Sequence, residues 1–339
     1  MAEGGVCISK AQPVDFEVAS EALAAFAEHE RSADVSRILH IVPGLNDPTN
    51  GIAVAAKLIA ARNGDLIVDA KDFRGLDVAR FGFLDEVWVH SMWLPRTLRA
   101  CWKVLRAGIP LVRMPHGCMD PVKVRYHWWK KMWVMPVEKY FMRRATRIVA
   151  TEEVEAEWIK SFVRLGLRST PTIQMLELNN VVKFMPRPGL GNRKFLFVGR
   201  MHPLKGVDVL IEAVRSLKTD GRLPADFQLT IIGKDEKGMR VGFESAAQDL
   251  PIRFLGEVDE NVKRREMSVA DYLVLPTLSE NFGLVVKESL ELGVPVITTD
   301  GAKYWKSKPG VTYIDGYLAA SHVERVRLLK DAIEKFANG

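Results

Sequence analysis

The chain has 339 residues, enough for about two domains of roughly 150 residues, with 47% hydrophobic and 27% charged residues. This balance is typical of a soluble globular protein and excludes a disordered, collagen-like or disulfide-stapled chain. The three cysteines, Cys7, Cys101 and Cys118, show no C-x-x-C spacing, which favours a reduced, cytosolic compartment. We expect no signal peptide, and no apolar run approaches the roughly 20 residues of a membrane-spanning helix.

The formal net charge of +6 is concentrated in one segment. Between Pro121 and Arg147, eight basic residues stand against one acidic residue, Glu138, so this window carries +7. The rest of the chain is therefore close to −1. We expect any electrostatic partner to bind at this basic segment.

Residues 1–36 form an Ala-rich, mildly acidic N-terminal extension with no recognisable chemistry. From Arg37 onward, short β-rich runs alternate with helical stretches. The expected strands are 38–42, 66–68, 87–89, 110–112 and 147–150, and the expected helices are 52–62, 95–107, 127–144 and 154–163. This alternation predicts βαβ units and a parallel sheet in a first domain, residues 37–182.

Residues 183–192 hold two prolines and two glycines, which indicates a linker. A second alternation follows in residues 193–320. Its expected strands are 195–198, 228–232, 252–255, 272–275 and 294–298. A last helix, 322–336, belongs to a C-terminal segment, 321–339, that could pack back on the first domain. The fold class is therefore α/β, with two Rossmann-like domains whose parallel sheets face each other across a cleft.

The loop 199–206 follows the first strand of the second domain and precedes a helix that starts near Val207. Ligands of open parallel sheets bind at the carboxyl ends of strands, where helix N-termini present unpaired N–H groups. Arg200 and Lys205 in this loop suit a diphosphate, because two cations add to the helix dipole. The alternative is a solvated turn whose basic residues face water.

The run Ser279-Glu280-Asn281-Phe282-Gly283 follows strand 272–275 and leads into a helix. Glu280 in the loop can face a reacting group, while Glu288 inside the helix can reach a vicinal diol such as a ribose. Gly283 permits a close backbone approach at the helix N-terminus. Two glutamates at this spacing are otherwise a solvated helix face.

The composite of Arg200, Lys205, the run 279–288 and the run 293–300 resembles retaining glycosyltransferases of the GT-B fold, in particular glycosyltransferase family four. The resemblance is close over residues 195–300 and looser over residues 37–180. It implies two Rossmann-like domains, a nucleotide-sugar donor held mainly by the second domain, an acceptor held mainly by the first, and no metal or other cofactor.

The resemblance also implies roles for individual residues. Arg200 and Lys205 would neutralise the donor diphosphate and stabilise the leaving nucleoside diphosphate. Glu280 would contact the transferred sugar and Glu288 the ribose. The other implied donor-binding residues are Gly51, Gly199, Gly256 (at the nucleobase), Asn281, Phe282, Gly283 and Leu284.

In the first domain, His116 matches the family's strand-end histidine, which lies near the donor sugar. The alternative for a lone histidine is a purely structural role. The chain departs from the family pattern in three places: Asn50-Gly51 replaces paired glycines, Asn179-Asn180 replaces an Asn-Gly turn, and 301–306 replaces a glycine-rich acidic stretch. These departures leave the identity of the donor open.

Aromatic residues interleave with the cations of the basic segment, among them Trp128, Trp129 and Trp133. This pattern suits the surface of an anionic membrane. The candidate membrane-surface residues are Lys123, Arg125, Lys130, Lys131, Arg143 and Arg144. In the alternative interpretation the tryptophans pack inward and the cations face water, since Pro136 interrupts the pattern.

The sequence therefore predicts a retaining, metal-independent hexosyltransferase that moves a sugar from a nucleoside diphosphate to a hydroxyl acceptor. The expected setting is the cytoplasm or the cytoplasmic face of a membrane, in the synthesis of lipopolysaccharide, glycolipid or another cell-surface polysaccharide. The alternatives are a catalytically silent nucleotide-sugar-binding protein and a basic nucleic-acid-binding protein, although no nucleic-acid motif is present. No residue suggests a covalent nucleophile, which is compatible with a front-face mechanism.

Overall fold

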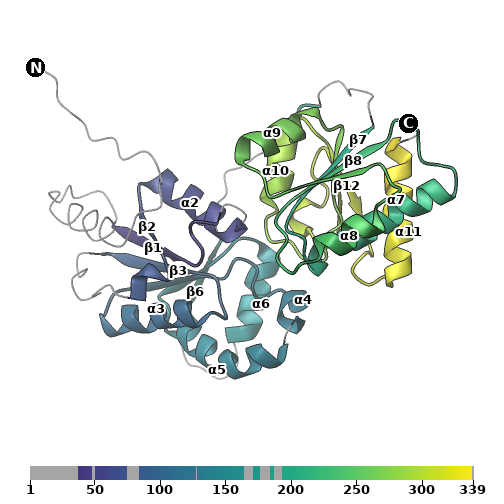
Figure 1. Ribbon diagram of the computed structural model, residues 1–339. Helices are drawn as coiled ribbons and strands as arrows, with labels where there is room; N and C mark the ends of the chain where they lie inside the picture. The colour runs from purple at the N-terminus through teal and green to yellow at the C-terminus, as the bar shows by residue number, and fades with distance from the viewer. Residues whose placement is uncertain are drawn as a thin grey trace, which may run out of the picture. The chain divides into compact units, whose positions relative to one another are not determined.

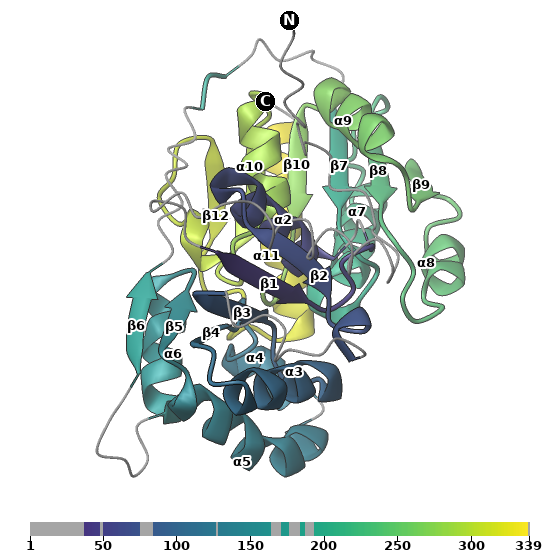
Figure 2. The ribbon, with the colours of Figure 1, turned by 90° about the vertical axis from the view of Figure 1, so that its left-hand side faces the viewer.

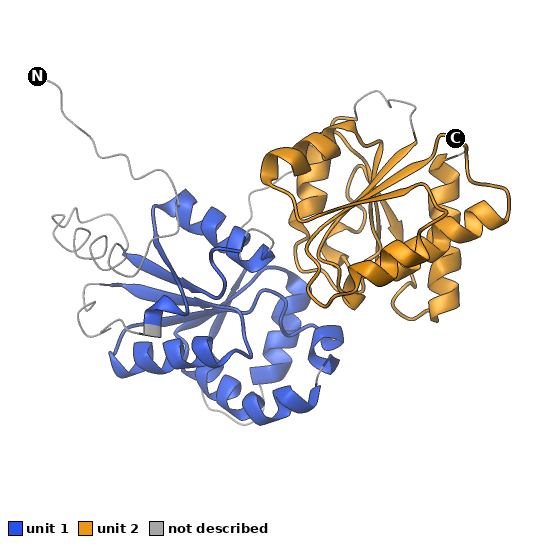
Figure 3. Ribbon diagram, viewed as in Figure 1, with its two compact units in different colours: residues 1–176 blue, residues 177–339 orange. Residues whose placement is uncertain are grey.

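The computed structural model describes residues 37–47, 50–74, 84–126, 128–163, 171–175, 184–186 and 193–337. The chain divides into two compact units, residues 1–176 and residues 177–339 (Figure 3). The predicted extension 1–36, the Asn179-Asn180 turn and most of the linker 183–192 lie outside the described residues.

Unit 1 is an α/β layer structure around a parallel sheet (Figure 1). The strands are β1 (Ile38–Val42), β2 (Leu66–Asp69), β3 (Glu86–His90), β4 (Leu111–Met114), β5 (Arg147–Ala150) and β6 (Thr172–Met175). The helices are α2 (Gly51–Asn63), α3 (Pro95–Arg106), α4 (Pro121–Arg125), α5 (Trp128–Arg144) and α6 (Glu153–Val163), with a short 3₁₀ turn η1 (Asp72–Arg74). The strand order is β2-β1-β3-β4-β5-β6. The chain adds β2 on one side of β1 and the later strands on the other side, so the strand order reverses between β1 and β3.

Alternate residues of β1 supply the two faces of this sheet. Leu39 and Ile41 join a buried cluster with Val104 of α3, whereas Ile38 packs in another cluster with Ile59 of α2. Successive side chains of a strand point to opposite faces. Helices α2 and α3 therefore cover opposite faces of the sheet, and Figure 2 shows α2 beside β1 and β2.

Unit 2 repeats the architecture with a second parallel sheet (Figure 1). The strands are β7 (Lys194–Val198), β8 (Gln228–Ile232), β9 (Ile252–Gly256), β10 (Tyr272–Leu275), β11 (Val296–Thr299) and β12 (Val311–Ile314). The helices are α7 (Val207–Thr219), α8 (Arg240–Ala246), α9 (Glu260–Val269), α10 (Leu284–Glu291) and α11 (His322–Ala337), with 3₁₀ turns η3 (Pro203–Lys205) and η4 (Lys303–Trp305). The strand order β12-β11-β10-β7-β8-β9 reverses between β7 and β10.

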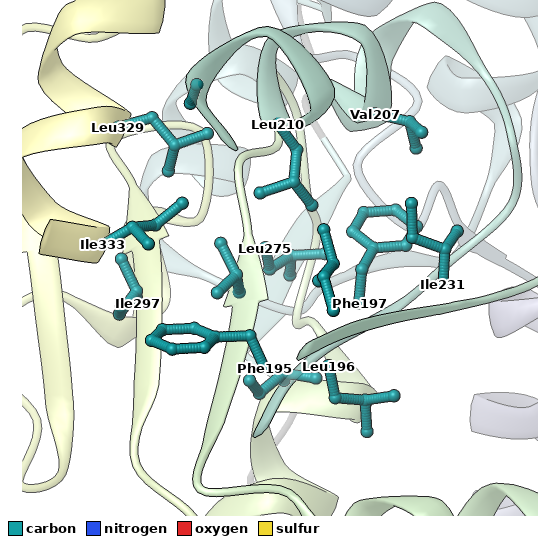
Figure 4. Close-up of a cluster of buried hydrophobic side chains, with 14 of the residues drawn as sticks. Phe195, Leu196, Phe197, Val207, Leu210, Ile231, Leu275, Ile297, Leu329 and Ile333 are labelled. Carbon is teal, nitrogen blue, oxygen red and sulfur yellow. The ribbon is translucent and has the colours of Figure 1, made fainter. Parts of the chain in front are cut away.

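One continuous apolar core holds unit 2 together (Figure 4). Leu210 of α7 and Leu329 and Ile333 of α11 are fully buried and face Leu275 and Ile297 of the sheet. Burying a leucine or isoleucine side chain stabilises a fold by about 1.5–3 kcal/mol. The C-terminal helix packs on α7 and so forms part of the core of its own unit.

The predicted fold class is confirmed: each unit is an α/β structure on a parallel sheet. Two edge strands, β6 and β12, were not predicted, because they are partly exposed and lack a continuous apolar run. Strand β4 begins at Leu111, after Pro110, since proline has no N–H to give to the ladder. Helix α5 continues through Pro136.

Candidate functional site

Lys205 and Glu280 lie together at the carboxyl edge of the unit 2 sheet. Lys205 closes the loop after β7, Glu280 lies in the loop after β10, and their side chains form an ion pair. Strands β7 and β10 are neighbours at the point where the strand order reverses. In open α/β sheets this point is where ligands bind. The structure therefore brings together two of the predicted site residues at the expected place.

Backbone hydrogen bonds fix the loops that carry this pair. The Leu204 carbonyl accepts from Leu278 N at 2.8 Å and from Thr277 Oγ1 at 3.1 Å. On the other side, Glu280 N donates to the Gly301 carbonyl at 2.8 Å. The loops after β7, β10 and β11 thus form one connected surface.

Helices α7 and α10 both start at this surface, and each has a glycine as its N-cap. Gly206 and Gly283 have left-handed φ angles of 69° and 71°, and neither helix has a side-chain cap. A Cβ on Gly206 would lie 2.3 Å from the Pro276 carbonyl oxygen, so only glycine fits there. Two helix N-termini without a capping side chain, next to a lysine, make a suitable site for a phosphate group.

Arg200 lies in the same loop but pairs with a different acid. Its Nη1 atom is 2.7 Å from Glu236 Oε1, and 44% of its side chain is exposed. Glu236 follows Asp235, which accepts hydrogen bonds from the N–H groups of Met239 and Arg240 at 2.9 and 3.1 Å. These N–H groups lower the pKa of the Asp235 carboxyl, although desolvation acts in the opposite direction. The sequence interpretation missed both acids, although the run Lys234-Asp235-Glu236-Lys237 shortly after β8 marks this loop as charged.

Three neighbouring strands of this sheet end in glycine: Gly199 follows β7, Gly233 follows β8 and Gly256 ends β9. Gly233 N donates to the Gly256 carbonyl at 2.8 Å. A Cβ on Gly233 would lie 1.8 Å from the Gly199 carbonyl oxygen, so the close approach of the backbones requires glycine. Gly233 was missed, although a glycine directly after an apolar strand is a detectable signal.

Glu288 lies in α10 and pairs with Lys263 of α9 at 2.9 Å. Lys263 also pairs with Glu260, at 2.9 Å. Burial alone would lower the pKa of Lys263, but the hydrogen bonds that its ammonium donates to the two carboxylates outweigh burial and raise it. The side chain of Glu288 is 32% exposed, so its carboxylate remains accessible to a ligand.

The departure from the family pattern at 301–306 has a structural role. Trp305, in η4, is 2% exposed and donates from Nε1 to the Phe282 carbonyl at 2.5 Å. Its ring also contacts the Phe282 ring, with 5.5 Å between centroids. Phe282 is thus a buried support of the loop. Its neighbours Asn281 and Leu284 are partly exposed.

In unit 1, His116 follows β4 at the carboxyl edge of the sheet and is 4% exposed. Its φ angle is 54°, and Gly117 follows with a φ angle of 69°. The N–H of Gly117 donates to the carboxylate of buried Glu155. A non-glycine residue in the left-handed region is uncommon and marks a tightly determined turn.

Gly51 is the first residue of α2, and Asn50 is its N-cap. The Asn50 side chain accepts from Ile52 N at 3.1 Å and donates to the Pro43 carbonyl at 2.7 Å. A Cβ on Gly51 would meet nothing within 4 Å. The side chain of Asn50 therefore occupies part of the helix N-terminus that the sequence assigned to a ligand.

The basic segment forms α4 and α5, and six of its large apolar side chains are exposed, whereas Phe141 and Met142 are buried. The exposed side chains line one side of α5, because they recur at helical spacing. The exposed members are Trp128 (56%), Trp129 (54%), Met132 (52%), Trp133 (82%), Val137 (43%) and Tyr140 (49%). The inward-packing interpretation is therefore wrong for these residues. We call this set the α5 stripe.

The predicted membrane-surface cations fall into two groups. Lys130 lies 5.1 Å from the Trp129 ring centroid, Arg144 lies 5.4 Å from that of Tyr140, and both are exposed, as is Arg125. Lys131 instead donates to the Lys123 carbonyl, and Arg143 donates to the Val163 carbonyl at 3.4 Å. Among the residues whose positions are described, no helix is long and apolar enough to cross a bilayer.

A cavity of about 280 Å³ lies where η1 and the start of α3 meet. Three cationic side chains line it: Lys71, Arg96 and Arg99. Within the described part of the chain, no group of three or more His, Cys, Asp or Glu residues is arranged to hold a metal ion.

A family model described as Glycosyl transferases group 1 matches residues 192–337. The D-inositol 3-phosphate glycosyltransferase of Jonesia denitrificans is 38% identical over 116 residues, which cover 31% of this chain and 26% of that protein. The phosphatidyl-myo-inositol mannosyltransferase of Mycobacterium leprae is 36% identical over 116 residues, covering 33% and 29%. The matches thus span about a quarter to a third of the length of these relatives.

Two solved structures resemble the whole fold. Sucrose-phosphate synthase from Thermosynechococcus elongatus superposes with a TM-score of 0.63 at 16% identity, covering 89% of this chain and 94% of that one. A UDP-forming trehalose-phosphate synthase from Burkholderia xenovorans gives 0.62 at 14% identity, with 89% and 95% covered. At such identities the likeness shows the fold alone, and that fold is the GT-B fold predicted from the sequence.

Proposed function

We propose that this protein transfers a sugar from a nucleoside-diphosphate donor to a hydroxyl acceptor, because residues 192–337 match the family model described as Glycosyl transferases group 1. The observation that carries the proposal is the Lys205–Glu280 pair at the reversal point of the unit 2 sheet, beside the uncapped N-termini of α7 and α10. This arrangement offers a cation and backbone N–H groups to a diphosphate, and a carboxylate to a sugar hydroxyl.

The pairing of Lys205 with Glu280 gives each group a partner before the donor binds. When the diphosphate enters, Lys205 turns to the phosphate oxygens and Glu280 is released to accept from sugar hydroxyls. The lysine then stabilises the negative charge that grows on the leaving nucleoside diphosphate, which is where a fixed cation accelerates transfer most. Arg200 supplies a second cation from the same loop, and Glu288 accepts from the ribose hydroxyls.

We further propose that the hexosyl transfer retains the anomeric configuration, by a front-face path in which the leaving phosphate helps deprotonate the acceptor. NMR of the freshly formed product gives the anomeric configuration directly. An inverted product would exclude this mechanism while leaving the donor site intact.

We also propose that the acceptor carries an anionic group beside its hydroxyl. The names of the two relatives favour this, because one contains D-inositol 3-phosphate and the other phosphatidyl-myo-inositol. The cavity lined by Lys71, Arg96 and Arg99 supports this proposal, because its cations would attract a phosphate. Arg96→Glu/Arg99→Glu should raise the acceptor KM and leave the donor KM unchanged.

We also propose that the α5 stripe binds an anionic membrane, so that the enzyme acts at the cytoplasmic face in the synthesis of a glycolipid or cell-surface polysaccharide. Exposed aromatic rings beside cations, Trp129 beside Lys130 and Tyr140 beside Arg144, suit the interface, and each cation near an anionic surface contributes about 1 kcal/mol. Cosedimentation with vesicles of rising anionic-lipid content should fall for Lys130→Glu/Trp133→Ser/Arg144→Glu.

The matched control for the membrane test is Arg62→Glu/Lys160→Glu, which reverses two exposed charges on α2 and α6. It should bind vesicles nearly as well as wild type. Equal binding by the α5 variant and wild type would exclude the α5 stripe as the membrane site and direct the acceptor search to soluble molecules.

Donor identity is tested by thermal-shift screening with UDP-, GDP-, ADP- and CMP-sugars, followed by transfer assays with the donor that binds. A ligand at 100 times its Kd stabilises the protein by about 2.7 kcal/mol. Binding without transfer to any phosphorylated polyol or lipid would favour the catalytically silent alternative. No stabilisation by any of the four classes would overturn the proposed function.

A further inference from the structure

Three histidines of unit 1 form a continuous hydrogen-bonded chain. His40 lies in the middle of β1, His90 ends β3, and His116 follows β4. His40 Nδ1 is 2.8 Å from His90 Nε2, and His90 Nδ1 is 2.7 Å from His116 Nε2. His40 and His90 are fully buried and His116 is 4% exposed. We call this set the histidine chain.

The histidine chain ends in a carboxylate. His40 Nε2 lies 3.1 Å from Asp65 Oδ2, and the side chain of Asp65 is 2% exposed. Asp65 precedes β2, whereas His116 follows β4. Because the strands are parallel, the chain runs from the amino edge of the sheet to its carboxyl edge.

The carboxylate gives the chain a direction. An ionised carboxylate only accepts hydrogen bonds, and a neutral imidazole has one donor nitrogen and one acceptor nitrogen. A neutral His40 therefore donates from Nε2 to Asp65 and accepts at Nδ1 from His90 Nε2. By the same rule, His90 accepts at Nδ1 from His116 Nε2. The remaining nitrogen, His116 Nδ1, is left without a proton.

Burial favours the neutral form of His90 and His116. Desolvation lowers the pKa of His116 to about 3, and electrostatic interactions with Lys123 and His40 act in the same direction. Desolvation also lowers the pKa of His90 well below its ordinary value, with further contributions from His116, His40 and Arg113. A neutral ring can receive a hydrogen bond at one nitrogen while it donates from the other.

Hydrogen bonds to Glu155 also fix the backbone turn that carries His116. Glu155 accepts from the N–H of Gly117 and from Thr151, whose N and Oγ1 atoms lie 2.8 and 2.6 Å away. Glu155 is 1% exposed. The turn that carries His116 is therefore anchored to α6, and the ring to the sheet.

We propose that Asp65, His40 and His90 are positioning residues that hold His116 with Nδ1 unprotonated, so that this atom accepts a hydrogen bond from a substrate hydroxyl. An ionised phosphate group has no proton to donate, so Nδ1 discriminates against it. The inference rests on the proposed function, which supplies hydroxyls on both the transferred sugar and the acceptor. The resemblance in the sequence places His116 near the donor sugar, and the proposal adds the residues that orient its ring, Asp65, His40 and His90, which lie outside the matched residues 192–337.

The tautomers are tested without substrate, by ¹⁵N NMR of histidine-labelled protein. Wild type should show a pyridine-type Nδ1 and a pyrrole-type Nε2 on His116. Asp65→Asn removes the charge and offers an amide that can donate or accept, so His116 should become a mixture of tautomers. The matched control is Asp85→Asn, since Asp85 also precedes a strand of this sheet, accepts from Arg37 N at 2.8 Å and contacts no histidine of the chain.

A protonated Nδ1 on His116 in wild type, as would follow if His40 carried both ring protons, overturns the proposal. So does an unchanged tautomer pattern in Asp65→Asn. If that variant fails to fold, His90→Phe interrupts the chain with a ring of similar size and should release the His116 tautomer in the same way. These spectra are independent of activity, so they can fail while the proposed function stands.

The substrate contact is tested by kinetics in the same variants. Asp65→Asn should lower kcat/KM by roughly 10-fold to 10²-fold, the range for partners that orient a ligand-facing histidine, and Asp85→Asn should not. A change confined to the donor KM assigns the hydroxyl to the transferred sugar, and one confined to the acceptor KM assigns it to the acceptor. A changed tautomer with unchanged kcat/KM overturns the substrate contact.

Discussion

The carboxyl edges of the two sheets hold their polar groups in different environments. In unit 2, charged side chains lie on loops and are partly exposed, with Lys205 13% and Arg200 44% accessible. In unit 1, three histidine rings lie almost completely buried and hydrogen-bonded to one another. The unit 2 edge presents charged side chains to a ligand, whereas the buried rings at the unit 1 edge fix the orientation of His116.

The difference follows from the cost of desolvation. A charged group that must exchange its protein partner for a ligand has to stay near water, because an unpaired buried charge is very costly. A neutral ring can be buried when both of its nitrogens are hydrogen-bonded, and burial then fixes its orientation. The charged side chains that bind a ligand therefore lie on loops, and the histidines that orient one another lie in the sheet interior.

The largest effect expected from this comparison is on stability. Arg113 and Glu138 form an ion pair at 2.9 Å with both side chains fully buried, so Glu138→Ala should destabilise unit 1 by about 3–5 kcal/mol. Glu236→Ala removes the partner of exposed Arg200 and should cost about 1 kcal/mol or less. Urea unfolding followed by hydrogen exchange in each unit measures both. Similar losses in the two variants would remove the contrast between the edges.

Lys205→Ala should lower turnover by roughly 10²-fold or more, because it removes a cation at the place where charge develops. The control is Lys330→Ala, which breaks a lysine–carboxylate pair with Asp220 between α11 and the end of α7. This pair lies at the opposite end of α7 from Gly206, so the variant should leave turnover nearly unchanged, and such a pair contributes only about 1 kcal/mol or less to stability. Normal turnover in Lys205→Ala and in Arg200→Ala would refute the diphosphate assignment.

The two glutamates of unit 2 should separate binding from transfer. Glu288→Ala should weaken nucleoside-diphosphate binding by about tenfold, equivalent to one hydrogen bond to a charged group, and leave kcat nearly unchanged. Glu280→Gln should mainly lower kcat. Calorimetry with the nucleoside diphosphate and steady-state kinetics with the full donor distinguish the two. Intact transfer by Glu280→Gln would show that the roles are assigned wrongly.

The smallest expected effect is that of chelation. We expect activity to persist in excess EDTA, because Lys205, Arg200 and two helix N-termini can take the place of a metal at the diphosphate. The measurement is turnover before and after EDTA, with Mg²⁺ restored as a control. A collapse that Mg²⁺ reverses would contradict a metal-free mechanism.

The sequence predicted that the charged loops of unit 2 meet at one edge of the sheet, because its signals are local. Arg200 and Lys205 follow one strand and Glu280 follows another, so the general rule for parallel sheets places them at one edge. What it could not predict is that Lys205 pairs with Glu280 while Arg200 pairs with Glu236. Side-chain partners depend on strand order, which places β7 beside β10 on one side and β8 on the other.

By itself, the sequence determined the alternation of strands and helices, the parallel sheets and the charged loops, because periodicity and turn residues act over a few positions. Tertiary structure alone decided which way α5 faces and joined His40, His90 and His116, which lie 50 and 26 positions apart in the chain. No local pattern marks those histidines as a set. They meet because β1, β3 and β4 are neighbours in the sheet, and a hydrogen bond between side chains depends on distance in space.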